Sequence, residues 1–304
     1  MKKLRNEFAD LMLDIGSKDN RLVVMVGDIS HGILKPFAKK YPERYYNIGI
    51  CEPSMVNIAA GLKKIGLIPV VHTIAPFITE RAFEQIKLDF GYQKLGINLV
   101  SIGSAFDYSK LGCSHHCYND ASILSHLNNS QVFIPGSDIE FKELFKSAYK
   151  KNKINYFKLT DNDHGFQFNK NDIKIGKGII VYPGTNLTIC VIGAQLKNVL
   201  KAREKLKEKK ISAEIIYFPS LKPFDKNIVI KSVKKTQKII TVEELSAHDG
   251  LFNQCIKSLA GRKFKYKQIA IKDFIHEYGT YEELCNITGL SARNIIHQSL
   301  KLFN

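Results

Sequence analysis

Short apolar runs alternate with longer amphipathic segments along most of this chain, which is the pattern of a parallel α/β sheet. In the first half, apolar runs predict strands at residues 22–26, 45–48, 68–73, 97–102, 131–134 and 155–159. Helical spacing of apolar positions predicts helices at residues 4–15, 34–40, 53–62, 80–92, 120–127 and 140–150. The chain is therefore expected to begin with an α/β unit.

A second α/β unit is expected after a polar connector rich in Asn, Asp, Lys and Gly. The alternation returns there, with strands predicted at 187–192, 213–218 and 238–242, a helix at 196–209 and a turn at 219–225. We therefore predict an α/β protein of two domains, each with a mostly parallel sheet flanked by helices. The expected division is residues 1–165, a linker at 166–185 and a smaller domain at 186–304.

Composition narrows the class of protein. A length of 304 residues is enough for two domains with a sizeable core. No apolar run is long enough to cross a bilayer, and the charged start has no apolar core after it, so neither a membrane span nor a signal peptide is expected. We predict a cytoplasmic protein. Six cysteines in a chain of this length do not indicate a disulfide framework.

The net charge of +16 raises the question of a polyanionic partner. A nucleic-acid-binding protein concentrates its positive charge in a patch, whereas the lysines here are spread over the whole chain. We therefore expect no nucleic-acid partner. A phosphate-bearing substrate or an acidic partner protein fits the charge equally well.

A carboxylate, Glu52, stands where a predicted strand ends and a predicted helix begins. The small residues Ala59, Ala60 and Gly61 allow that helix to pack closely on a sheet. One interpretation is a residue that interacts with the helix dipole. The other is a buried acid with a catalytic role, because functional sites gather such carboxylates.

Two adjacent histidines, His115 and His116, lie in a polar loop between Cys113 and Cys117. An imidazole can move a proton close to neutral pH, so either histidine could act as a general acid or base. A zinc site is the competing interpretation. Adjacent histidines do not easily point at one metal, and no second ligand pair has the required spacing, so no metal ligand is expected.

These segments resemble the transketolase family, which uses thiamine diphosphate. Residues 47–62, 69–89 and 112–120 follow the motif order of the family's pyrimidine-binding domain. Residues 211–225 and 240–251 resemble the transketolase C-terminal domain, where only a structural role is implied. The resemblance runs over nearly the whole chain.

The resemblance implies how the cofactor is held. Glu52 would hydrogen-bond to the pyrimidine ring and favour the tautomer that activates the cofactor, which requires a carboxyl able to hold or share its proton. Phe77 would stack on the same ring. Ile50, Ile74 and Arg81 are implied as further cofactor contacts, and Ile74 stands where the family usually has a second aromatic residue.

The resemblance also implies how the substrate is held. Ser114 and His115 align with a Thr-His pair that faces the substrate, and His116 takes the histidine's place if the loop slips by one residue. Arg5 matches a phosphate-contacting arginine. Asp161 stands where the family commonly has a second one, and a carboxylate there would repel a phosphate. The resemblance thus implies that the carbanion chemistry of the family is preserved. It does not imply that the chain recognises an ordinary sugar phosphate.

The family's motif for magnesium and diphosphate is not found in this sequence. Residues 26–30 resemble it but lack its second glycine and the later asparagine. We therefore expect the C-terminal subunit of a split transketolase-like enzyme, which uses thiamine diphosphate. A separate N-terminal subunit would supply the contacts to Mg²⁺ and diphosphate, and the two would form a heterotetramer.

The expected reaction transfers a two-carbon ketol unit from a ketose to an aldehyde or ketone sugar, with a nucleotide-linked sugar as one candidate acceptor. Two other enzyme classes share the layout, namely the beta subunit of a 2-oxo acid dehydrogenase and a deoxyxylulose-phosphate-synthase-like enzyme. A non-catalytic interaction subunit is the alternative from another class.

Overall fold

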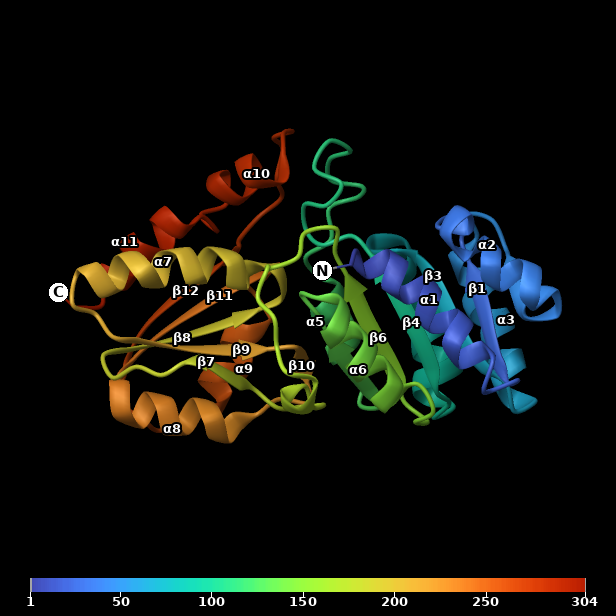
Figure 1. Cartoon of the computed structure of the whole chain (residues 1–304), viewed down its shortest axis with the longest axis horizontal. Coiled ribbons are helices and arrows are strands. Elements are labelled where there is room, and N and C mark those ends of the chain that lie inside the picture. Colours follow the sequence, from blue (N-terminus) through green and yellow to red (C-terminus); the bar gives the residue numbers. More distant parts are fainter. Residues whose placement is uncertain (1, 304) are drawn as a thin grey trace.

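The computed structural model describes residues 2–303 and confirms an α/β fold with two mostly parallel sheets (Figure 1). The first sheet has the strand order β10-β5-β6-β4-β3-β1-β2. Its strands are β1 (Leu22–Val26), β2 (Tyr45–Asn47), β3 (Ile68–Ile74), β4 (Ile97–Ile102), β5 (Ser130–Phe133), β6 (Ile154–Leu159) and β10 (Ser220–Lys222). Apart from antiparallel β10, neighbouring strands in this sheet are parallel.

Helices cover both faces of the first sheet because its strands are apolar on both sides. On one face pack α1 (Leu4–Gly16), α2 (His31–Lys40) and α6 (Asp138–Ala148). On the other pack α3 (Glu52–Lys64), the helical segment that contains α4 (Phe83–Gln85), and α5 (Asp120–Ser125). Alternate residues of β1, such as Val23 and Val24, point into the two cores.

The segment at 80–92, which the sequence pattern predicts as a regular α-helix, is partly π-helical in the structure. The helical path begins earlier, at Phe77, and is π-helical at Phe77–Arg81 and again at Ile86–Tyr92. Single π-helical turns often occur at functional sites, because they re-aim side chains that a regular helix would place elsewhere. Here the first such turn carries both Phe77 and Arg81.

The second sheet has the order β12-β11-β8-β9-β7. Its strands are β7 (Ile179–Tyr182), β8 (Leu187–Ile192), β9 (Ala213–Phe218), β11 (Lys238–Ser246) and β12 (Lys265–Ile271). The helices of this unit are α7 (Leu196–Glu208), α8 (Lys226–Thr236), α9 (Leu251–Ser258), α10 (Tyr281–Ile287) and α11 (Ala292–Leu300). The sequence pattern predicted none of the elements beyond β11.

Two short strands do not follow the expected division into domains at residues 165 and 186. The division itself stays a prediction. β7 lies within the expected linker and forms an antiparallel edge of the second sheet with β9. β10 lies in the expected turn at 219–225, yet it pairs with β5 of the first sheet. The second unit is therefore tied to the first by backbone hydrogen bonds as well as by side chains.

The carboxyl ends of β4 and β6 lie near those of β8 and β11, around a cavity of about 20 Å³. The loop after β4 rises between the two units in Figure 1 and contacts both. Its Phe106 amide donates to Glu244 (3.3 Å), and the Ser246 amide donates to the Tyr118 carbonyl (2.9 Å). Within residues 2–303, no helix is both long and apolar enough to cross a membrane.

Candidate active site

Glu52 is fully buried at the first turn of α3, just beyond the carboxyl end of β2. The Thr73 hydroxyl, at the end of neighbouring β3, donates to Glu52 Oε1 at 3.2 Å. Gly27 follows β1, and a side chain at that position would come within 3.3 Å of the same carboxylate oxygen. Three strand ends thus meet around one carboxylate, at the edge of the sheet where α/β proteins bind ligands.

The second carboxylate oxygen of Glu52 is held by Arg81, whose Nη1 donates to Oε2 at 2.9 Å. The Arg81 guanidinium also lies 4.3 Å from the centre of the Phe77 ring, in a cation–π contact. The Arg81 side chain is 45% exposed, whereas Glu52 is fully enclosed. A buried acid, an aromatic ring and a half-exposed cation therefore lie together, and their role as cofactor contacts stays a prediction.

The loop after β4 brings His115 to this cluster. Its ring packs edge-on against Phe77 with centroids 5.2 Å apart, and the Ser114 hydroxyl lies 3.0 Å from His115 Nδ1. Burial, together with the nearby Arg81, lowers the pKa of His115. His115 is therefore neutral at pH 7 and able to accept a proton.

His116 lies on the other side of the loop. It is buried and packs edge-on against Phe106, with ring centroids 5.8 Å apart. Burial lowers the pKa of His116 as well. Of the two histidines, His115 contacts Phe77 and His116 faces the second unit. Among residues 2–303, no three metal-ligating side chains come together as a metal site would require.

Tyr108 extends the site away from Phe77. Its ring lies 5.8 Å from that of His115, and a side chain at Gly103 would collide with it at 3.0 Å. Gly103 has φ +110, a backbone conformation that favours glycine and here makes room for the tyrosine. Burial and the neighbouring carboxylates of Asp161 and Asp107 raise the pKa of Tyr108, so it stays a neutral phenol.

Beyond Tyr108 lies the residue expected to contact a phosphate. Arg5 Nη2 donates to the Ser30 hydroxyl at 3.2 Å, and Ser30 lies 2.8 Å from His72 Nε2. His72 Nδ1 lies 2.7 Å from the Val100 carbonyl, which can only accept, so Nδ1 carries the proton and Nε2 accepts from Ser30. Burial lowers the pKa of His72 to about 4, so this imidazole is neutral and orients the serine toward Arg5.

The structure joins Arg5 to Asp161, the residue that departs from the family pattern. Arg5 Nη1 and Asp161 Oδ2 are 3.9 Å apart. Asp107 holds this corner in place by accepting hydrogen bonds from the Ser104 and Asp161 amides, at 2.8 and 3.0 Å, and from the Thr160 hydroxyl at 2.9 Å. The guanidinium expected to meet a phosphate is therefore already paired with a carboxylate.

The remaining predicted residues lie at the edge of this site. Ile74 ends β3 and lies beside Gly103 and the Tyr108 ring. Ile50 is 70% exposed on the loop before α3. Ser114 is exposed and supports the His115 ring. Their roles toward cofactor or substrate stay predictions.

The loop that carries His115 is anchored by a buried ion pair. Lys158, in β6, donates to Asp120 Oδ1 at 2.8 Å and to the Cys117 carbonyl at 2.7 Å. Tyr156 donates a second hydrogen bond to Asp120. Burial opposes the ammonium form of Lys158, but the adjacent carboxylate of Asp120 outweighs it and raises the pKa of Lys158. The pair fixes the end of the loop just beyond His116.

Several residues of the site were not found from sequence. Thr73, Ser30, His72, Tyr108 and Asp107 belong to strand ends or loops that lie far apart in the chain. The usable signal was their position at the end of a predicted strand, for His72 and Thr73, or in the loop that follows one, for Ser30, Asp107 and Tyr108. Their contacts depend on the order of strands in the sheet, which local periodicity does not determine.

Comparison with known proteins identifies the class to which this fold and site belong. The family model "Transketolase, pyrimidine binding domain" matches residues 1–163, and "Transketolase, C-terminal domain" matches residues 176–295. The chain belongs to the transketolase family. Its two domains extend over nearly the full length of relatives that are described as a transketolase C-terminal section or a transketolase subunit.

A protein described as a transketolase C-terminal section, from Methanocaldococcus jannaschii, is 30% identical over 97% of this chain and 94% of its own length. The 6-deoxy-6-sulfo-D-fructose transketolase subunit SqwH from a Clostridium species is 27% identical over 96% of this chain and 92% of its own length. A solved structure titled "Split gene transketolase, inactive beta4 tetramer" superimposes with a TM-score of 0.87 at 27% identity, covering 98% of this chain and 97% of that one. This chain is thus a split-transketolase-like subunit of a thiamine-diphosphate-type enzyme.

Proposed function

We propose that this chain supplies the pyrimidine side of a thiamine diphosphate site and transfers a two-carbon ketol unit between sugars. The observation that carries the proposal is the fully buried Glu52 carboxylate at the carboxyl edge of the sheet, linked through Arg81 to the Phe77 ring. Two relatives are named as transketolase subunits that act on a particular sugar, and these names support the reaction class. They are SqwH and an apulose-4-phosphate transketolase component from Actinobacillus succinogenes.

The residues of the site fit the pyrimidine end of that cofactor. When bound, thiamine diphosphate supplies a nucleophilic carbon that carries the two-carbon unit. Glu52 would hold a proton at the pyrimidine nitrogen, and Phe77 would pack on the ring face. Arg81 now makes both of these contacts, to Glu52 and to Phe77, so it would have to move aside when the ring enters.

On the substrate side, His115 would accept or donate the proton of the reacting oxygen. It is the histidine that lies against Phe77, and its neutral form is available at pH 7. Tyr108 would line the path toward Arg5, and the Arg5–Asp161 pair would bind the far end of the acceptor through its hydroxyl groups.

We propose a separate partner subunit for the diphosphate and Mg²⁺ contacts, and a heterotetramer of the two chains in the cytoplasm. The name of the solved relative supports a split assembly. The test combines this chain with a separately expressed diphosphate-binding subunit, thiamine diphosphate and Mg²⁺. Transfer from a hydroxyketose donor is expected only when both subunits are present. Turnover by either chain alone would contradict the split assembly.

The donor discriminates between related enzymes. A transketolase-like enzyme uses a hydroxyketose and does not use pyruvate. Use of pyruvate with an aldehyde acceptor would instead indicate a synthase like 1-deoxy-D-xylulose-5-phosphate synthase, of which a relative from Halothermothrix orenii is 26% identical to this chain over 47% of its own length. Pyruvate-dependent acylation of a lipoyl group would indicate a 2-oxo acid dehydrogenase.

Replacing Asp161 with Arg is expected to change acceptor preference. The substitution removes the carboxylate that pairs with Arg5 and adds a second phosphate-binding cation, so KM for a phosphorylated acceptor should fall about 10–100-fold. KM for unphosphorylated and nucleotide-linked acceptors should not fall. Steady-state kinetics on a panel of the three acceptor types measures this, with the exposed Asp172→Arg variant as the charge-matched control. An equal gain in both variants would contradict a role for Asp161.

His115→Asn is expected to lower kcat by about 10²-fold, because a positioned general acid or base is lost. Since burial lowers the pKa of His115, wild-type activity should persist below pH 6.5 and decline only as the imidazole becomes protonated at lower pH. The acid limb of the kcat–pH profile should be lost in His115→Asn. His276→Asn, at an exposed position, serves as the control. A larger loss in His116→Asn than in His115→Asn would assign the role to His116.

A further inference from the structure

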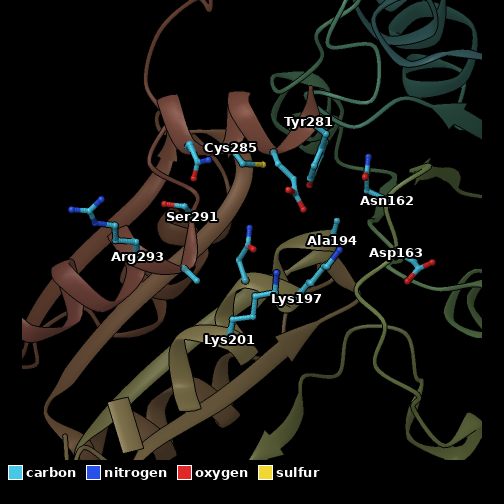
Figure 2. Close-up of a pocket in the computed structure, with 13 residues that line it drawn as sticks. Asn162, Asp163, Ala194, Lys197, Lys201, Tyr281, Cys285, Ser291 and Arg293 are labelled. Carbon is cyan, nitrogen blue, oxygen red and sulfur yellow. The ribbon is translucent and has the colours of Figure 1, made fainter. Parts of the chain in front are cut away.

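A second cavity, of about 300 Å³, lies between the second unit and the connector after β6, and shares no residue with the Glu52 site (Figure 2). Its walls come from the start of α7, from α10, from the start of α11 and from the connector after β6. This volume is at the lower end of the range for small-molecule sites, and suits a ligand the size of a sugar phosphate or a mononucleotide.

The cavity lies where α/β sheets usually bind ligands. Ala194, in its wall, follows the carboxyl end of β8. From β8 the chain crosses to β9 on one side, whereas β11, on the other side of β8, continues outward to β12. The strand order therefore changes direction between β8 and β11, and such switch points open a crevice at the carboxyl edge. The cavity borders this edge through Ala194, and residues from the ends of both strands line the smaller cavity of about 20 Å³ beside it.

Two neighbouring lysines without carboxylate partners line the cavity, and Arg293, at the start of α11, adds a third cation. Lys197 and Lys201 are one turn apart on α7, and neither forms an ion pair with any of residues 2–303. Figure 2 shows both side chains extending from α7 toward the cavity. By contrast, Lys205 on the same helix pairs with Glu208 at 2.9 Å. Like charges spaced i and i+4 repel each other, so an anion between Lys197 and Lys201 would relieve the repulsion.

The opposite wall carries neutral polar groups beside two charged side chains, Glu282 and Arg293. The Tyr281 hydroxyl donates to Glu244 at 2.6 Å, and burial, together with that carboxylate, raises the pKa of Tyr281. Burial also raises the pKa of Cys285 to about 12, so its thiol stays protonated. Asn286 and Ser291 add an amide and a hydroxyl. Such a wall can hydrogen-bond a sugar or a base, while the lysines hold a charged group.

The cavity also borders the loop of the candidate active site. Glu244, which accepts from Tyr281, also accepts from the Phe106 amide at 3.3 Å. The Phe106 ring packs against both Tyr281 and His116, with centroids 6.3 and 5.8 Å away. A molecule that touches Tyr281 would therefore be separated from the histidine loop by one layer of side chains.

We propose that this cavity binds a small metabolite bearing a phosphate or a similar multiply charged oxyanion, with Lys197 and Lys201 on the anion and Asn286 and Ser291 on the remainder. Glu282 and Asp163 also line the cavity, so the remainder of the ligand should offer hydroxyl or amino donors and no second anionic group at its far end. The site is separate from the proposed thiamine diphosphate site and does not depend on it.

Isothermal titration of the full chain, without partner or thiamine diphosphate, tests this site with inorganic pyrophosphate and AMP as probes. The wild-type chain is expected to bind at least one probe with a stoichiometry of one. Lys197→Ala/Lys201→Ala should weaken binding at least tenfold. The control is Lys205→Ala/Lys209→Ala, which removes the same charge at the far end of α7 and should change affinity by less than about twofold.

The Glu52→Gln chain should bind the probe as the wild type does, which keeps this test independent of the proposed catalytic function. Absence of binding of both probes up to millimolar concentration would overturn the site. Equal weakening in the two lysine double variants would also overturn it, because it would indicate attraction to the overall positive charge instead of binding in the cavity.

Discussion

Glu52→Gln should lower kcat about 10²–10⁴-fold, because an amide cannot hold and return a proton at the pyrimidine nitrogen. The change is nearly isosteric, and the amide oxygen can still accept from Thr73 or Arg81, so the fold should be retained. Steady-state turnover with the partner subunit, saturating thiamine diphosphate and Mg²⁺ measures the effect. Circular dichroism and size-exclusion chromatography check that folding and assembly are unchanged.

The matched control is Glu84→Gln, an exposed position one helical segment away, which should retain wild-type turnover. Full activity of Glu52→Gln would contradict a catalytic role for this carboxylate. If instead neither the wild type nor the variant turned over any donor with the partner bound, the chain would be a non-catalytic interaction subunit. The experiment therefore separates the enzyme from the alternative class.

Lys158→Met is expected to lower the free energy of unfolding by about 3–5 kcal/mol, because it leaves the Asp120 carboxylate buried without its cation. The side chains of Lys158 and Asp120 are 2% and 0% exposed, so water cannot take the place of the ammonium. The loss of the hydrogen bond to the Cys117 carbonyl should also loosen the histidine loop. Chemical denaturation of the chain, followed by circular dichroism, measures the stability.

Two further variants test whether the unpaired buried charge of Asp120 causes the loss of stability in Lys158→Met. Lys153→Met, at an exposed position directly before β6, should change stability by less than about 0.5 kcal/mol. Asp120→Asn/Lys158→Met should be more stable than Lys158→Met, since no unpaired carboxylate remains and the amide can still accept from Tyr156. A double variant no more stable than the single one would point to lost packing as the cause.

The Arg5–Asp161 pair bears on the question of substrate. Arg5 fits a phosphate contact when the sequence is considered alone, and Asp161 argues against it. In the structure the two side chains lie together, so under the proposed function the same corner would offer one positive and one negative group to the acceptor. Such a pair suits the hydroxyl groups of an unphosphorylated or nucleotide-linked sugar better than a phosphate dianion. The relatives differ among themselves in the sugar that their names give.

The sequence by itself determined the alternation of strands and helices, the two-domain α/β class and the position of Glu52 at a junction of strand and helix. These features follow from apolar periodicity and from local motifs, which neighbouring residues encode. The strands at 22–26, 97–102, 187–192 and 213–218 were predicted with the bounds the structure has, because each is a compact apolar run.

The tertiary structure alone decided which distant side chains meet. It placed His115 and not His116 against Phe77, paired Arg5 with Asp161, and added β10 to the first sheet. It also replaced the expected regular helix at 80–92 with a path that is π-helical at Phe77–Arg81 and at Ile86–Tyr92. Such contacts depend on strand order and on the path of loops. The free energy that selects them comes from packing between segments far apart in the chain, which no local pattern of residues records.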